Sequence, residues 1–170
     1  QRRAVRGRVR PRAPVAGPRR GASGRRWWAY QRERFPLALH GPLVLALSAG
    51  ALGYSALARG GEFLGWAPLG VGFLTALLGF FQLRVADEFK DFSDDARHRP
   101  ERAVPRGLVS LRELAGLAAG AAALQLALNL WLAPGLVPFL LLVWGYMALM
   151  RVEFFAAAWL KARPGAYLLS

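Results

Sequence analysis

Residues 84–110 read RVADEFKDFSDDARHRPERAVPRGLVS, and strongly apolar sequence lies on both sides of them. Five of the ten acidic residues of the chain fall within nine positions of this stretch. They are Asp87, Glu88, Asp91, Asp94 and Asp95. If the preceding helix continues through this window, each residue advances by about 100° around the axis. Glu88, Asp91 and Asp95 then share one face of the helix.

Carboxylates held this close together need a neutralising partner. Two unpaired carboxylates about 6 Å apart repel by roughly 3 kcal/mol at an effective dielectric near 20. Arg84 near the middle of the acid face, a divalent cation, or protonation through raised pKa values would each relieve the repulsion. Carboxylates are hard ligands, so the cation would be Mg²⁺ or Ca²⁺. Mg²⁺ usually takes one or two carboxylates and completes its shell with water and substrate phosphate.

The second half of the stretch supplies partners for phosphate. Its basic side chains are Arg97, Arg99, Arg102 and Arg106, with His98 among them. Arginine matches phosphate oxygens with two parallel hydrogen bonds. An acid face followed by an arginine-rich loop therefore predicts a metal-bridged diphosphate site.

The order of these residues resembles the first aspartate-rich motif of the UbiA superfamily of intramembrane prenyltransferases. The chain reads Asp87-Glu88-x-x-Asp91-x-x-x-Asp95 and then Arg99-Pro100-x-Arg102-x-x-Pro105-x-Gly107. The family motif usually reads N-D-x-x-D-x-x-x-D, followed by R-P-x-R-P-x-P-x-G. Asp87 stands at the usual Asn, Glu88 at the usual first Asp and Ala103 at a common Pro, while the spacing is kept. The extra charge of Asp87 could change the number or affinity of the bound metals.

The resemblance implies Mg²⁺-dependent transfer of a prenyl group from a prenyl diphosphate to an acceptor, often aromatic, within the membrane. It implies metal contacts for Asp87, Glu88, Asp91 and Asp95, of which Asp91 and Asp95 would be the catalytic carboxylates. It implies diphosphate contacts for Arg99, Arg102 and Arg106, whereas Asp94 is expected to be a solvated neighbour.

The same family carries a second acid cluster in its later half, which this sequence does not include. The chain therefore reads as the front portion of a longer enzyme, and we expect residues 1–170 alone to be inactive.

The net charge of +13 is concentrated at the N-terminus. The first 34 residues hold twelve arginines and a single acid, Glu33, so almost all of the excess charge lies there. Residues 1–24 have no apolar periodicity and predict a disordered tail. Such a tail is either solvated in the cytoplasm or in contact with anionic lipid, and no nucleic-acid partner is expected. The chain has no cysteine, which excludes a disulfide framework, a thiolate metal site and a cysteine nucleophile.

Four apolar segments predict an all-α, polytopic transmembrane bundle. The expected spans are about 36–58, 63–85, 111–132 and 136–159, each close to the length of about 20 residues that crosses hydrocarbon. Aromatic residues and arginines alternate before the first span, so a short interfacial helix is expected from about Arg25 to Phe35. Residues 25–170 would form the N-terminal part of a larger UbiA-type bundle.

Polar residues near and within the spans have local structural interpretations. Ser110 and Glu113 form a capping-box pattern that starts the third span. Gln125 and Asn129 lie one turn apart and are expected to form hydrogen bonds between helices rather than to bind a ligand. His40 is expected to make a local hydrogen bond.

Basic residues predict the orientation. Twenty-two of the twenty-three Lys and Arg residues fall in the tail, in the central stretch through Arg112, or in residues 151–163. Loops rich in Lys and Arg stay in the cytoplasm. The chain is therefore expected to be a multi-pass protein of the cell membrane, with its N-terminus and acid stretch facing the cytoplasm.

Three other classes of protein share some of these features. Soluble prenyl diphosphate synthases use aspartate-rich motifs, but Asp94-Asp95 lacks a following Asp at the right distance, and four spans argue against a soluble fold. A CDP-alcohol transferase would begin its motif D-G-x-x-A-R, which is absent. A non-enzymatic polytopic membrane protein, such as half of a transporter, stays open.

Overall fold

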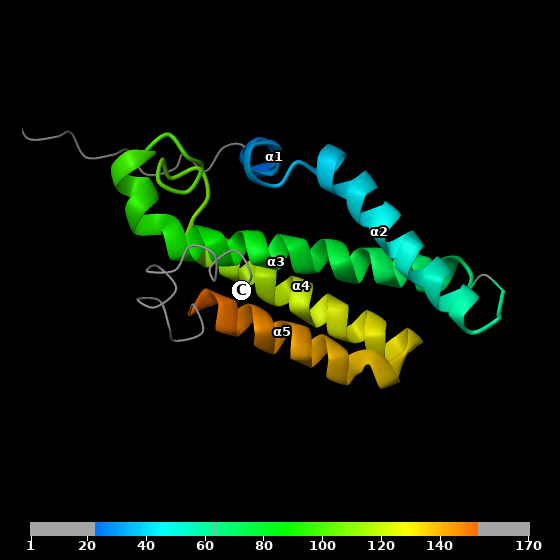
Figure 1. Ribbon diagram of the computed structural model, residues 1–170. Coiled ribbons are helices and arrows are strands. Elements are labelled where there is room, and N and C mark those ends of the chain that lie inside the picture. Colours follow the sequence, from blue (N-terminus) through cyan, green and yellow to red (C-terminus); the bar gives the residue numbers. More distant parts are fainter. Residues whose placement is uncertain (1–22, 63, 153–170) are drawn as a thin grey trace, which may run out of the picture.

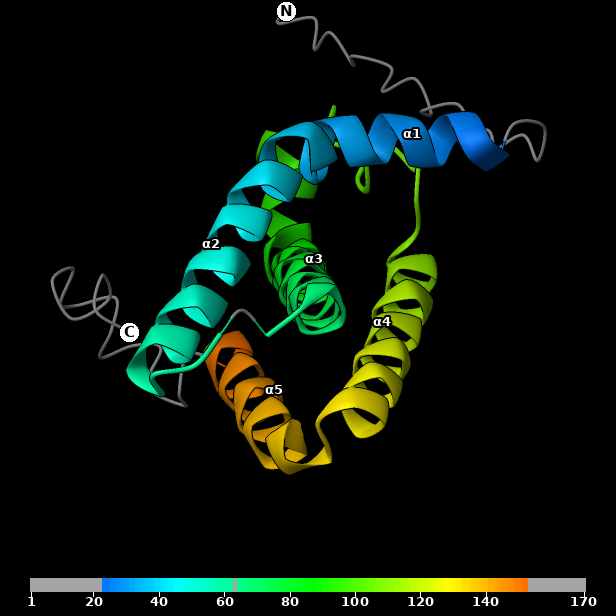
Figure 2. The same ribbon diagram turned by 90° about the vertical axis from the view of Figure 1, so that its right-hand side faces the viewer.

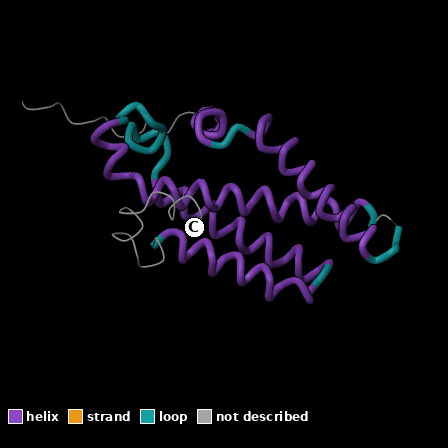
Figure 3. The backbone as a smooth tube through the Cα atoms, viewed as in Figure 1, coloured by secondary structure: helices purple, strands orange, loops and turns teal. Residues whose placement is uncertain are grey.

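A computed structural model describes residues 23–62 and 64–152, and all regular structure in these ranges is helical (Figures 1 and 3). Four of the helical segments are long and apolar enough to cross a membrane, which confirms the predicted all-α, membrane-spanning fold. Most of the expected tail (residues 1–22) and the expected inner end of the fourth span (153–159) lie outside the described residues.

The helices follow one another along the chain with short connections. They are α1 (Ser23–Arg34), α2 (Leu37–Ala58), α3 (Trp66–His98), α4 (Leu111–Leu132), the 3₁₀ turn η1 (Pro134–Leu136) and α5 (Val137–Arg151). The ends of α2 and α4 agree with the prediction to within one residue. Helix α1 begins within the predicted tail, two residues earlier than expected, and α3 begins at Trp66 rather than at position 63.

The capping box explains why α4 starts where it does. The backbone N–H of Glu113 donates to the Ser110 hydroxyl at 3.2 Å, and the backbone N–H of Ser110 donates to the Glu113 carboxylate at 2.9 Å. Both bonds satisfy donors that the first helical turn would otherwise leave open. The predicted capping box is confirmed.

Helix α3 is the centre of the bundle. Seen along the spans, α2, α5 and α4 surround it on three sides, and α1 lies across the fourth side (Figure 2). Helix α1 runs crosswise to the spans, near the first residues of α2 (Figures 1 and 2).

Polar side chains join α3, α4 and α5 within the membrane-spanning part. Gln125 donates to the Thr75 carbonyl at 2.8 Å, and Asn129 donates to the Thr75 hydroxyl at 3.1 Å. Trp144 Nε1 donates to Gln125 Oε1 at 3.2 Å. These bonds confirm Gln125 and Asn129 as links between helices. His40 Nδ1 lies 3.0 Å from the Pro36 carbonyl, which confirms its local hydrogen bond.

A compact apolar cluster ties the charged end of α3 to its surroundings. Its buried members are Tyr30, Val85, Ala103, Val104, Val109 and Leu114. They come from α1, α3, the loop 99–110 and α4, so the arginine-rich loop folds back on the bundle. Gly107 has a φ of 76°, in the left-handed region that favours glycine, at the turn where the Leu108 N–H donates to the Ala103 carbonyl.

Candidate functional site

The acid window is helical throughout, because α3 continues to His98. This confirms the helical geometry that put Glu88, Asp91 and Asp95 on one face. Burial then divides the acids into two groups. Glu88 and Asp95 are buried, with exposed fractions of only 2% and 4%, whereas Asp87, Asp91 and Asp94 are exposed. The two buried acids lie seven residues apart, which brings them to the same side of the helix.

Two arginines converge on Glu88. Arg34 Nε, from the end of α1, donates to Glu88 Oε1 at 2.5 Å. Arg84 Nε lies 3.9 Å from the same oxygen, too far for a hydrogen bond. Arg84 NH1 lies 3.5 Å from Asp87 Oδ2. Arg84 therefore takes the neutralising position between the acids that the helical geometry predicted.

The second buried acid, Asp95, holds the arginines of the loop. Arg102 NH1 donates to Asp95 Oδ2 at 2.5 Å, and Arg99 NH1 lies 4.0 Å from Asp95 Oδ1. Two of the three predicted diphosphate arginines thus meet one of the predicted metal carboxylates. Removing charges from water is costly unless they are paired and hydrogen-bonded, so these contacts hold the loop in one conformation.

The third predicted diphosphate arginine points elsewhere. Arg106 NH2 lies 2.7 Å from Glu33 Oε1 on α1, and Arg106 NH1 donates to the Glu101 carbonyl at 3.2 Å. Arg26 of α1 also forms an ion pair with Glu113, at 2.6 Å. Helix α1 is therefore tied by ion pairs to α3, to the loop and to the start of α4.

Two of the exposed acids could bind a metal ion. Asp87 and Asp91 are one turn apart on α3, close enough to interact electrostatically. Within residues 23–62 and 64–152 no group of three or more His, Cys, Asp or Glu side chains is close enough to hold a metal ion. The residues present fit an ion that takes two carboxylates and completes its shell with water and phosphate, as Mg²⁺ does. The four-carboxylate ligand set stays a prediction.

Tyr30 lies against this charged group. Its side chain is buried, and its hydroxyl has no hydrogen-bond partner within the described part of the chain. Burial is the main cause that raises the pKa of Tyr30, and the nearby Glu88 carboxylate raises it further. The phenol therefore keeps its proton and is available as a hydrogen-bond donor.

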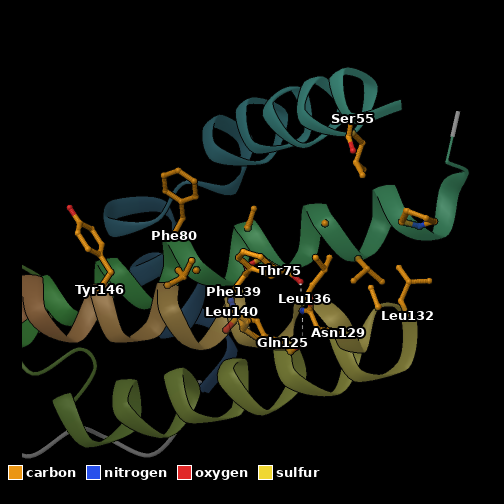
Figure 4. A pocket seen from close by; sticks show the side chains of 18 of the residues that line it. Ser55, Thr75, Phe80, Gln125, Asn129, Leu132, Leu136, Phe139, Leu140 and Tyr146 are labelled. Carbon is orange, nitrogen blue, oxygen red and sulfur yellow. Dashed lines mark hydrogen bonds between the residues drawn. The ribbon is translucent and has the colours of Figure 1, made fainter. Parts of the chain in front are cut away.

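An apolar cavity of about 830 Å³ starts near the acid window and runs along α3. Leu83 and Met150 line the end nearer to the acid window, and Arg59 and Leu64 line the opposite end. Its α3 residues run from Pro68 to Leu83, which corresponds to about 22 Å of helix. The polar side chains labelled among its apolar ones are Ser55 of α2, Thr75 of α3, Gln125 and Asn129 of α4, and Tyr146 of α5 (Figure 4).

The C-terminal end of α5 lies beside the acid window. The guanidinium of Arg151 stacks over the ring of Phe89, 5.6 Å from its centroid. Phe89 directly follows Glu88 on α3. Met150, which lines the cavity, directly precedes Arg151. The contact therefore places a further cation near that end of the cavity.

Sequence reasoning missed Arg34 and Tyr30 as members of this group. Both lie on α1, more than fifty residues before the acid window, and were interpreted only as parts of a headgroup-binding helix. One signal in the sequence could have identified them. Tyr30 and Arg34 are four residues apart and therefore lie on one face of α1, whereas the exposed Trp28 lies on another face.

No protein-family model, no curated protein and no solved structure matches the chain. The interpretation of the site therefore depends on the residues and contacts of this chain.

Proposed function

We propose that the chain belongs to a Mg²⁺-dependent membrane enzyme that transfers a prenyl group from a prenyl diphosphate to a small acceptor, with aromatic compounds as the favoured acceptor class. The observation that carries this proposal is one juxtaposition. The α3 lining of the apolar cavity ends at Leu83, and the acidic and arginine side chains follow on the next turns of the same helix and on its loop, so a charged diphosphate and an apolar chain would each find matching surroundings along α3.

The exposed pair Asp87 and Asp91 would hold the metal ion. When bound, Mg²⁺ would neutralise charge that develops on the diphosphate as its bond to the prenyl carbon breaks. Asp95 would contribute mainly by orienting Arg102. Their contact uses only one of the three guanidinium nitrogens of Arg102. The remaining nitrogens of Arg102, together with the exposed Arg99, are available to phosphate oxygens.

The cavity supports the prenyl part of the proposal. Its lining is dominated by Leu, Val, Phe and Met side chains, and its end nearer to the acid window lies at Leu83, one residue before Arg84. A diphosphate at Asp91 would lie eight residues beyond Leu83, about 12 Å along α3, and its prenyl chain would cover that distance before it enters the cavity. The apolar walls would keep water away from the allylic cation.

Binding of a radiolabelled prenyl diphosphate to the purified full-length protein tests the site. We expect binding that saturates with Mg²⁺ and is largely lost when EDTA removes the metal, because the acid face alone repels the ligand. Inorganic diphosphate should compete, and the prenyl alcohol should compete poorly. Binding that is unchanged by EDTA would contradict a metal-bridged diphosphate site.

A further inference from the structure

Arg34 is held in a way that leaves most of its hydrogen-bonding capacity open. Glu88 engages only Nε, and neither terminal nitrogen of Arg34 donates to another residue within the described part of the chain. The Arg34 side chain is 11% exposed, and that of Glu88 is 1% exposed. A guanidinium anchored through Nε presents its two terminal nitrogens as a fork, which is the arrangement that binds an oxyanion bidentately.

Two further buried donors near Glu88 have no hydrogen-bond partner in the described residues, although one of them lies 3.9 Å from the Glu88 carboxylate. They are the Tyr30 hydroxyl and Arg84 Nε. Tyr30 is 3% exposed, and its hydroxyl interacts electrostatically with Glu88, Arg84 and Arg34, so these groups lie together. A buried donor without an acceptor costs free energy, and an incoming acceptor removes that cost.

The charges around Glu88 also favour an anion. Two arginines share this one buried carboxylate, and the other nearby acid, Asp87, is exposed and 3.5 Å from Arg84. If Asp87 binds the metal ion, the positive charge on Arg84 becomes free for a ligand. The open groups are donors, so a metal ion would gain nothing from them.

We propose that Tyr30, Arg34 and Arg84 form a second phosphate-binding site, built largely by α1 and distinct from the loop arginines. Glu88 is then a positioning residue that holds Arg34, rather than a metal ligand. Glu88 lies about 10 Å nearer to the cavity along α3 than Asp95 does, since seven residues separate them. The site would therefore bind the phosphate attached to the prenyl chain, and this last assignment rests on the proposed function.

The α1 helix offers a matched control for testing the site. Arg26 also forms an ion pair with an acid of the bundle, Glu113 at 2.6 Å, but at the start of α4. Arg34→Gln and Arg26→Gln each remove one ion pair between α1 and the bundle. Only Arg34→Gln also removes a hydrogen-bond donor of the proposed site. Tyr30→Phe removes a hydroxyl and keeps the ring that packs in the apolar cluster.

Binding of inorganic diphosphate to the full-length protein in phospholipid-free detergent, at saturating Mg²⁺, is the experiment. We expect Arg34→Gln to weaken binding at least about tenfold and Tyr30→Phe about three- to tenfold, the scales for losing a charged and a neutral hydrogen bond. Arg26→Gln should stay within about twofold of the wild type. Equal weakening by Arg34→Gln and Arg26→Gln, or no effect of Tyr30→Phe in a normally folded protein, would overturn the site.

A second arm separates the substrate from a lipid headgroup as the source of the phosphate. The measurement is repeated in bilayer discs of phosphatidylcholine with and without phosphatidylglycerol. We expect the same affinity in both. If phosphatidylglycerol competes in the wild type and not in Arg34→Gln, the site binds lipid and the substrate assignment is wrong. Binding is measured without turnover, so the two proposals can fail separately. Arg34-dependent binding of diphosphate without prenyl transfer would reject the proposed enzyme activity and keep the second phosphate-binding site. Prenyl transfer with binding that does not depend on Arg34 would reject only the second phosphate-binding site.

Discussion

Asp91→Asn is expected to lower the rate of prenyl transfer by the full-length protein at least about a hundredfold, the loss typical of a main electrostatic element of an active site. Asp91 is exposed on the same side of α3 as Asp87, where a Mg²⁺ ion would find two carboxylates. Asparagine keeps the shape of the side chain and removes its charge. The rate is measured as prenylated product formed per unit of folded protein in membranes.

Asp94→Asn is the matched control for this substitution. Asp94 is also exposed on α3, three residues further on, and it loses the same charge. Asp94 lies seven residues beyond Asp87, about 10 Å further along the axis of α3, so it is too far away to share an ion with Asp87. We therefore expect its rate to stay within a few fold of the wild type. If the two variants lose activity equally, the assignment of the metal to Asp87 and Asp91 is wrong.

Glu88→Gln is expected to lower the free energy of unfolding by about 3 kcal/mol, the scale for leaving a buried charge without its partner. Glu88 is buried and stands between Arg34 and Arg84, so its loss leaves two cations facing each other. Denaturant-induced unfolding of the purified protein in detergent, followed by tryptophan fluorescence, measures the change.

Glu113→Gln is the control for charge loss at an ion pair of α1. Its partner is Arg26, and both side chains are about one-third exposed. Glutamine can also serve at the third position of a capping box, so the start of α4 is kept. We expect a loss of at most about 1 kcal/mol, as for exposed ion pairs. A loss as large as that of Glu88→Gln would mean that burial does not distinguish the two pairs.

Local signals explain why much of the fold could be predicted from the sequence. The capping box at Ser110 and the proline before Leu37 mark the starts of α4 and α2, and apolar segments of about 20 residues identify the spans. Helical periodicity also put Glu88 and Asp95 on one face and Arg84 between the acids. Each of these signals acts over a few residues of the same segment.

The rest depends on where other segments pack, which periodicity does not encode. An angle around α3 says that Glu88 and Asp91 are neighbours, but not that α1 covers the first and leaves the second exposed. That difference arises because Tyr30 packs with Val85 and Val104 in the apolar cluster, which brings Arg34 onto Glu88. Periodicity also did not show that Arg106 contacts Glu33, which it does because the loop folds back toward α1. Its predicted diphosphate contact stays a prediction.

The most direct test of the central claim is formation of prenylated product. The full-length protein in membranes is given a radiolabelled prenyl diphosphate and a mixture of aromatic acceptors, and product is separated and counted with Mg²⁺ or with EDTA. The account predicts product that requires Mg²⁺ and disappears in Asp91→Asn. Tight, Mg²⁺-dependent binding of the prenyl diphosphate with no prenylated product from any acceptor class would contradict it, and would favour a non-enzymatic membrane protein.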